Sequence, residues 1–188
     1  MDVLVATASG IVLAASAGLR AFMPLFAAGV AARTLGWDLA PRMQWLSSDA
    51  ALLVFGIATV VEVVADKIPL VDHALDAVHT ILGPIAGAVA GLSVWLHFPP
   101  VVAAVLALVV GVPVAGGVHV FAATARIKST ALTGGSMNPV ASLIEDTVSV
   151  GAIALAVLVP VIALTLVVAL LIVVGRRAGR ASGRSAKV

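Results

Sequence analysis

The chain has 188 residues, of which 62% are hydrophobic and only 11% are charged, and its formal net charge at pH 7 is +2. This composition, with a mean hydropathy of +1.20, lies far outside the range of soluble domains and excludes that class. The chain has no cysteine, which excludes disulfides, thiolate metal sites and thiol redox chemistry. We therefore expect an integral membrane protein that resides in the lipid bilayer.

The hydrophobic segments predict an all-α fold. They are rich in Ala, Val, Leu and Gly and lack the alternating strands of a barrel, the other backbone that can span lipid. Since about 20 apolar residues cross a bilayer as a helix, we expect a polytopic transmembrane helical bundle of about five to six spans with broken or kinked helices. It forms one transmembrane domain over 1–175. The segments are 3–32, 45–65, 77–96, 101–123 and 147–174.

The first segment contains a charged residue deep inside it. Arg20 stands between Gly18 and Pro24, and a proline removes a backbone donor and clashes with the carbonyl four residues earlier, here that of Arg20. We expect a kink or break that divides the segment into two half-helices. Arg20 then pairs with a carboxylate, contacts carbonyls that the kink frees, or reaches the membrane interface.

Two carboxylates end the second segment. Glu62 and Asp66 are four residues apart, so a helix places them on one face about one turn apart. Lys67 follows, and Pro69 ends the helix. This pattern indicates a cation or proton site near the membrane boundary, with Lys67 as a counter-ion or part of a gate. The alternative is that both carboxylates are solvated at the interface.

A polar stripe leads into the third segment. At the spacing of one helix face, it carries Asp72, Asp76, His79 and Thr80. Two carboxylates and an imidazole can bind a divalent cation, and the same groups can relay protons. The pattern therefore allows a divalent cation as a cofactor but does not require one. The carbonyl of Thr80, freed by Pro84, adds an oxygen. The simpler alternative is an amphipathic interfacial helix whose polar face meets water.

A polar, glycine-rich stretch at 129–139 precedes the last segment. Asn138 is typical of a helix N-cap with Pro139 at the first helical position. One turn later, Ser142 and Glu145 have the spacing of a capping box. Such a helix start offers free amides to an anion or a lipid phosphate, although capping alone also explains the pattern.

Four further residues have no acidic neighbour in sequence. We interpret His97 and His119 as interfacial or hydrogen-bonded histidines rather than as ligands. Arg126 and Lys128 follow the fourth segment, on the same side of the membrane as the acidic stretches, against the tendency of basic residues to lie inside.

The acidic residues are clustered. Six of the nine fall in two stretches, within 62–76 and at 145–146. Two spans separate the stretches, so both face the same side of the membrane, and unpaired charges at that depth are costly. We therefore expect Asp66, Asp72 or Asp76 to lie within a few ångströms of Glu145 or Asp146, as a single site.

The C-terminal tail at 176–188 holds five of the eleven basic residues. Basic residues after a span favour the cytoplasmic side, so we expect a cytoplasmic C-terminus in the inner (plasma) membrane and affinity of the tail for anionic lipid. The tail has no aromatic residue and no folded domain behind it, so we expect no nucleic-acid partner.

A weak internal repeat is visible. The stretch 18–22 resembles 117–121, and the stretch 76–86 resembles 146–154. Repeats in transporters place the substrate site where the halves meet. In so biased a composition, a chance match is the alternative.

Several motifs together resemble a known family. They are Ala-Gly-Leu-Arg-Ala-Phe at 17–22, Ala-Asp-Lys-Ile-Pro at 65–69, Gly-Pro-Ile-Ala-Gly at 83–87, Thr-Gly-Gly at 133–135, Asn-Pro at 138–139 and Glu-Asp at 145–146. With these motifs the chain resembles small bacterial membrane proteins catalogued as domain of unknown function 4126. The resemblance implies a multi-span helical fold and no particular mechanism.

These patterns favour a small membrane transporter or channel with an acidic site for a cation, either a proton or a divalent metal. The alternative is a non-transporting scaffold or assembly subunit, or a protein that binds anionic lipid. No motif of a nucleophilic or metal-dependent hydrolase occurs, so we do not expect an enzyme. A homo-oligomer fits the small size of the chain.

Overall fold

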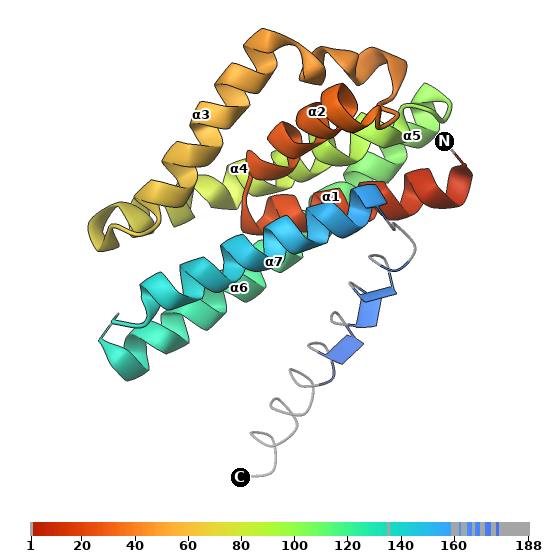
Figure 1. The fold of residues 1–188 in the computed structure, drawn as a ribbon. Coiled ribbons are helices and arrows are strands. Elements are labelled where there is room, and N and C mark those ends of the chain that lie inside the picture. Colours follow the sequence, from red (N-terminus) through yellow and green to blue (C-terminus); the bar gives the residue numbers. More distant parts are fainter. Residues whose placement is uncertain are drawn as a thin grey trace.

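The computed structural model describes residues 2–134 and 136–158, together with a few positions between 162 and 176; within it, the side chains of 69–75 are not described. The described residues form helices and no strand, which confirms the all-α class. The basic tail beyond Arg176 lies outside the described residues. In chain order (Figure 1), the elements are α1 Val3–Leu19, α2 Met23–Leu35, the 3₁₀ helix η1 Pro41–Ser47, α3 Asp49–Ala65, α4 Pro69–Trp95, α5 Pro100–Leu106, the π-turn η2 Ala107–Gly111, α6 Val112–Thr133 and α7 Asn138–Leu158.

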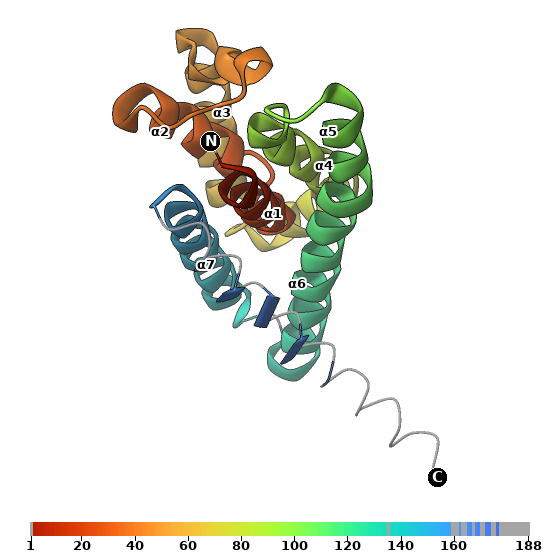
Figure 2. The same cartoon turned by 90° about the vertical axis from the view of Figure 1, so that its right-hand side faces the viewer.

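Helix α1 forms the centre of the bundle. It contacts α4, α6 and α7, and Figure 2 shows it in the middle with α7 on one side and α4 and α6 on the other. Its small residues permit this close packing, because a Cβ at Gly18 would lie only 2.3 Å from the carbonyl oxygen of Ala115 on α6. The sequence of α1 is apolar on every face, as expected for a helix that is buried all round.

The first hydrophobic segment is broken, as the sequence predicts. Helix α1 ends at Leu19, and α2 begins at Met23 with Pro24 in its first turn, where a missing N–H costs nothing. Helix α2 ends at Gly36, whose φ of 63° is the left-handed conformation that favours glycine. The break leaves residues 20–22 outside either helix.

The described residues contain three helices that are long and apolar enough to cross a membrane, Asp76–Trp95, Pro100–Thr133 and Asn138–Leu158. A fourth span results if η1 and α3, which meet at 64°, are counted together. We expected five to six spans, but the break leaves α1 and α2 as shorter apolar helices. The chain is a multi-pass membrane protein, and large apolar side chains such as Val54 and Ile57 are exposed at the surface of the bundle.

The fourth segment continues further than expected. The helix does not end near residue 123 but runs to Thr133, where Gly134 takes a positive φ of 62°. Arg126 and Lys128 therefore lie within α6, not in a loop. The glycine-rich stretch is correspondingly shorter than predicted, because α6 takes up residues 129–133, whereas α7 begins at Asn138, the residue expected as its N-cap.

The internal repeat is not preserved in local structure at its first pair of stretches. Residues 18–22 cover the end of α1 and the break, whereas residues 117–121 are an uninterrupted part of α6. The second pair, 76–86 and 146–154, is helical in both copies. The resemblance between these stretches therefore implies no common geometry other than a helix.

Candidate functional site

Asp66 is the centre of a buried charge cluster. It caps the C-terminus of α3 and is 5% exposed. Its Oδ2 accepts a hydrogen bond from Nη2 of Arg20 at 2.6 Å, and its Oδ1 accepts one from Nη1 of Arg126 at 2.8 Å. Two guanidinium groups that are far apart in the sequence thus share one carboxylate.

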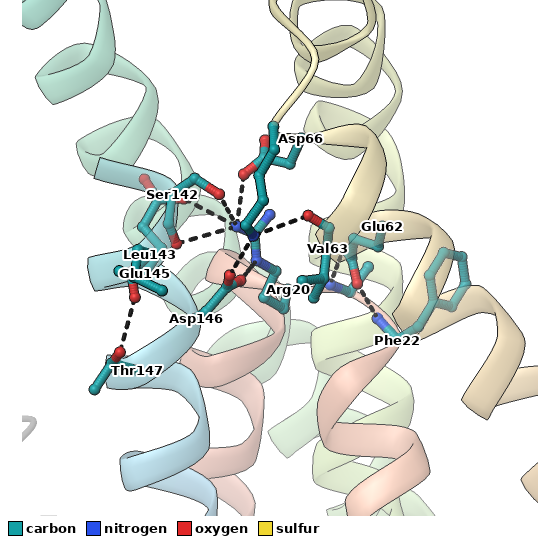
Figure 3. A network of polar contacts seen from close by, with 12 residues as sticks. Arg20, Phe22, Glu62, Val63, Asp66, Ser142, Leu143, Glu145, Asp146 and Thr147 are labelled. Carbon is teal, nitrogen blue, oxygen red and sulfur yellow. Dashed lines mark hydrogen bonds and ion pairs between the residues drawn. The ribbon is translucent and has the colours of Figure 1, made fainter. Parts of the chain in front are cut away.

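Helix α7 supplies the next two carboxylates. Asp146 accepts hydrogen bonds from Nε of Arg20 at 2.7 Å and from Nζ of Lys67 at 2.8 Å. Glu145 accepts from two nitrogens of Arg126, with the bond from Nε at 2.9 Å. Because the adjacent residues Glu145 and Asp146 bind different arginines, α7 is connected both to the α1–α2 break and to α6. Figure 3 shows Arg20 between Asp66 and Asp146.

The environment of Arg20 confirms the expectation that it is buried against a carboxylate. Its side chain is 2% exposed, and besides the two aspartates its Nη2 donates to the hydroxyl of Ser142 at 3.0 Å. The capping box expected from Ser142 and Glu145 is therefore wrong, because both side chains bind arginines. Their spacing on one face of α7 instead brings them to the same cluster.

Glu62 fills the break between α1 and α2. Its two carboxylate oxygens accept the backbone N–H groups of Ala21 at 2.7 Å and Phe22 at 3.2 Å, which have no partner inside a helix. On its other side, Oε1 lies 3.4 Å from Nδ1 of His79. Nε2 of the same ring lies 3.2 Å from the carbonyl oxygen of Ala17. One carboxylate and one imidazole therefore connect the break with α3 and α4.

The polar stripe of α4 continues toward α6. Oδ1 of Asp76 lies 3.1 Å from Nη1 of Arg126, and its side chain is 34% exposed, more than that of any other carboxylate in the cluster. Thr80 donates to the carbonyl of Asp76 at 2.9 Å and lies 3.1 Å from Nε2 of His119. The rings of His79 and His119 are stacked, with centroids 4.9 Å apart.

A cavity of about 390 Å³ lies beside this cluster. Its polar wall contains both arginines, both stacked histidines and four of the carboxylates. Its apolar wall includes Val54, Ile57 and Val61 of α3 and Val78 of α4, all of which are exposed at the surface of the bundle. The cavity therefore extends from a charged floor to an apolar rim.

The charges of the cluster do not cancel. Among the described side chains, five carboxylates meet three basic groups, which leaves two negative charges when the histidines are neutral. The carboxylates are Glu62, Asp66, Asp76, Glu145 and Asp146, and the basic side chains are Arg20, Lys67 and Arg126. Such an arrangement can attract a cation or hold an additional proton.

The structure brings most of the sequence-predicted site residues together. The residues in or beside the cluster are Arg20, Glu62, Asp66, Lys67, Asp76, His79, Thr80, Glu145 and Asp146. Asn138 lies apart: it is the first residue of α7, and its Oδ1 accepts from the hydroxyl of Thr130 at 3.1 Å. The side chain of Asp72 lies outside the described residues.

The expected divalent-metal stripe has no counterpart among the described side chains, where no group of three metal-binding residues is present. Asp76 contacts Arg126, whereas His79 contacts Ala17 and Glu62, so the two do not converge. The part that Asp72 would contribute stays a prediction.

Sequence reasoning missed Arg126 and His119. His119 is a hydrogen-bonded histidine, one of the two expected alternatives, but it is also 7% exposed, stacks on His79 and lines the cavity. Arg126 was placed beyond the end of a helix, although no glycine or proline interrupts the sequence before Gly134. Continuing the helix to that glycine would have put Arg126 on the same face as His119, two turns away.

Comparison with protein families agrees with the resemblance noted from the motifs. The family described as "Domain of unknown function (DUF4126)" matches residues 7–179. The chain belongs to this family. The match covers every element of the cluster, from α1 to α7. No curated protein and no solved structure matches the chain.

Proposed function

We propose that this DUF4126 protein is a small membrane transporter or channel that moves a cation through the acidic cavity, with the proton as the favoured ion. The observation that carries the proposal is the surplus of carboxylates on the wall of a cavity within a membrane protein. Ionisable residues at membrane depth are costly, and they are typical of ion and proton pathways.

Asp76 is the member of the cluster best suited to exchange an ion. Its side chain is one-third exposed, and its contact with Arg126 at 3.1 Å is longer than the contact of 2.8 Å between Arg126 and Asp66. A cation that enters the cavity can therefore meet Asp76 without breaking the buried pairs. The neighbouring His79 and His119 add groups that can carry protons.

The proton is favoured over a divalent metal because of the ligand geometry. A divalent ion needs several oxygen or nitrogen ligands directed at one point, whereas four of the five described carboxylates of the cluster bind arginines and Glu62 binds backbone amides. A divalent metal remains the second ion of the proposal, to be tested in the same assay.

The test is ion flux in liposomes that contain the purified full-length protein. We expect proton flux from the wild type and loss of that flux in Asp76→Asn, which keeps the shape but removes the charge. Asp49→Asn is the matched control, because Asp49 is an exposed carboxylate at the start of α3 that pairs with Arg33 and does not line the cavity. Its flux should equal that of the wild type.

Wild-type liposomes without flux of protons, sodium, magnesium, manganese or calcium would overturn the proposal. In that case the cluster acts as a structural clamp, and the scaffold or lipid-binding alternative holds. Equal flux from Asp76→Asn and the wild type would also contradict it, because the cavity would then not be the pathway.

The proposal includes an orientation and partners. The five basic residues of the tail favour a cytoplasmic C-terminus in the inner membrane and binding of the tail to anionic lipid. The small size of the bundle favours a homo-oligomer. Vesicle binding with and without anionic lipid, before and after removal of residues 177–188, tests the role of the tail.

A further inference from the structure

Both ring nitrogens of His79 face hydrogen-bond acceptors. Nε2 lies 3.2 Å from the carbonyl oxygen of Ala17, and Nδ1 lies 3.4 Å from Oε1 of Glu62. A neutral imidazole has a single N–H, and a carbonyl oxygen cannot donate. With the hydrogen on Nε2, the lone pair of Nδ1 would point at a carboxylate, so two acceptors would face each other unless another proton lies between them.

We infer that Glu62 and His79 hold one shared proton at neutral pH and are the proton-binding site of the cavity. The proton forms the hydrogen bond between Nδ1 and Oε1, with either a carboxylic acid and a neutral ring or a carboxylate and an imidazolium. In both forms the pair is neutral overall. The inference rests on the proposed function, because it names the site at which the transported ion binds.

Glu62 and His79 require the shared proton because their side chains are buried. The side chains of His79 and Glu62 are only 12% and 7% exposed, so water has little room to solvate two facing acceptors. A buried polar contact without a hydrogen is costly, and a buried charge without a partner is costlier still. One proton removes both costs.

The charged groups around the pair of Glu62 and His79 are bound to other partners, so the charge of the pair has to be balanced within the pair. Arg20, at the break, binds Asp66 and Asp146, while Arg126, on α6, binds Glu145, Asp66 and Asp76. The oxygens of Glu62 accept from Ala21 and Phe22 and face His79, and the ring of His119 from α6 stacks on His79. Both arginines are thus engaged by other carboxylates, in a cluster that already has an excess of negative charge.

The proton also acts on the fold around the cavity. Glu62 holds the free amides of the α1–α2 break, and His79 holds the last turn of α1 through the carbonyl of Ala17. The shared proton therefore joins α3 to α4 across the end of α1. When it leaves, the two acceptors repel each other across the wall of the cavity that α3 and α4 both form.

The test is spectroscopic and uses the full-length protein in lipid nanodiscs at neutral pH. Nitrogen NMR of labelled histidines reports the protonation of His79, and infrared spectroscopy reports a carboxylic acid by its carbonyl stretch. We expect either an imidazolium at His79 or a protonated carboxyl group at Glu62. A neutral His79 together with an ionised Glu62 would overturn the inference.

Two variants show whether the spectroscopic signals arise from Glu62 and His79. In Glu62→Gln the amide NH₂ can donate to Nδ1, so we expect a neutral His79 and loss of any acid band. His97→Gln is the matched control, because Nδ1 of His97 also bonds a backbone carbonyl, that of Val94, while its other nitrogen faces Asp38 outside the cavity. This control should leave the signal of the pair unchanged; its loss in His97→Gln would contradict the assignment. The wild-type spectra decide the matter even if Glu62→Gln does not fold.

The spectra and the flux assay can fail independently. A shared proton in a protein that moves no ion would refute the proposed function and leave the site intact. Proton flux through a protein whose pair holds no extra proton would refute the site alone.

Discussion

Arg20 and Arg126 bind opposite oxygens of the same carboxylate. Nη2 of Arg20 lies 2.6 Å from Oδ2 of Asp66, and Nη1 of Arg126 lies 2.8 Å from Oδ1. The shared carboxylate joins the α1–α2 break, the end of α3 and the middle of α6, and Glu145 extends the connection to α7. The cluster therefore positions the wall of the cavity as well as its charge.

Removing Arg20 should destabilise the protein strongly. Arg20→Ala removes one of the two arginines that bind Asp66 and leaves Asp146 with the partly exposed Lys67, and breaking a buried pair costs about 3–5 kcal/mol. Thermal unfolding of the purified protein in detergent, and the amount of folded protein recovered from membranes, measure the loss.

The control is Arg33→Ala, which removes an arginine from the exposed pair with Asp49. Exposed pairs contribute about 1 kcal/mol or less, so this variant should unfold close to the wild type. Equal stability of Arg20→Ala and Arg33→Ala would show that the charge cluster does not hold the helices together.

Lysine should not replace Arg126. The guanidinium donates from two nitrogens to Glu145 and from a third to Asp66 and Asp76, whereas an ammonium on a different stem cannot reproduce this planar geometry. We expect Arg126→Lys to lose about 2 kcal/mol of stability, the scale of one hydrogen bond to a charged group.

Chemical or thermal unfolding compares Arg126→Lys with Lys128→Gln, a change at an exposed position of the same helix. The control should be nearly neutral. If Arg126→Lys were as stable as the wild type, charge alone would account for the role of Arg126, and the geometry of the contacts would not matter.

Gly83 should control the position of His79. A Cβ at Gly83 would lie 2.8 Å from Cδ2 of the ring, so Gly83→Ala must displace the imidazole from Ala17 or Glu62. We expect an altered nitrogen spectrum of His79 and reduced proton flux, although no ionisable group is removed.

Gly151→Ala on α7 is the matched change, because no atom lies within 4 Å of a Cβ there. It should leave the spectrum and the flux unchanged, and the higher helix propensity of alanine should add up to about 1 kcal/mol of stability. A wild-type spectrum of His79 in Gly83→Ala would contradict the described ring position.

Gly18 should be essential for the packing of α1 on α6. Its Cβ would lie 2.3 Å from a backbone oxygen of Ala115, and a backbone cannot turn aside as a side chain can. We expect Gly18→Ala to cost about 1–3 kcal/mol, the range for overpacking of a core. Gly117→Ala, on α6 and with open space around it, serves as the control in the same unfolding assay; a loss of similar size there would point to a general effect of the substitution.

The sequence alone determined the features that depend on local chemistry. Composition and hydropathy established a helical membrane protein, because the backbone in lipid must satisfy its own hydrogen bonds. Pro24 and Gly18 predicted the break of the first segment, since a proline removes a donor wherever it stands. The clustering of acidic residues pointed to the helices that meet at the cavity, because buried charges must find partners.

Only the tertiary structure decided which partners those are. Nothing in the local pattern shows that Arg20 and Arg126 share Asp66, or that Glu62 closes the break, because these contacts join residues far apart in the chain. The same contacts explain why α6 and α7 extend beyond their apolar segments. Their polar turns, which by hydropathy alone belong in water, pair with each other through Arg126 and Glu145 and with charged residues at the end of α3 and at the α1–α2 break.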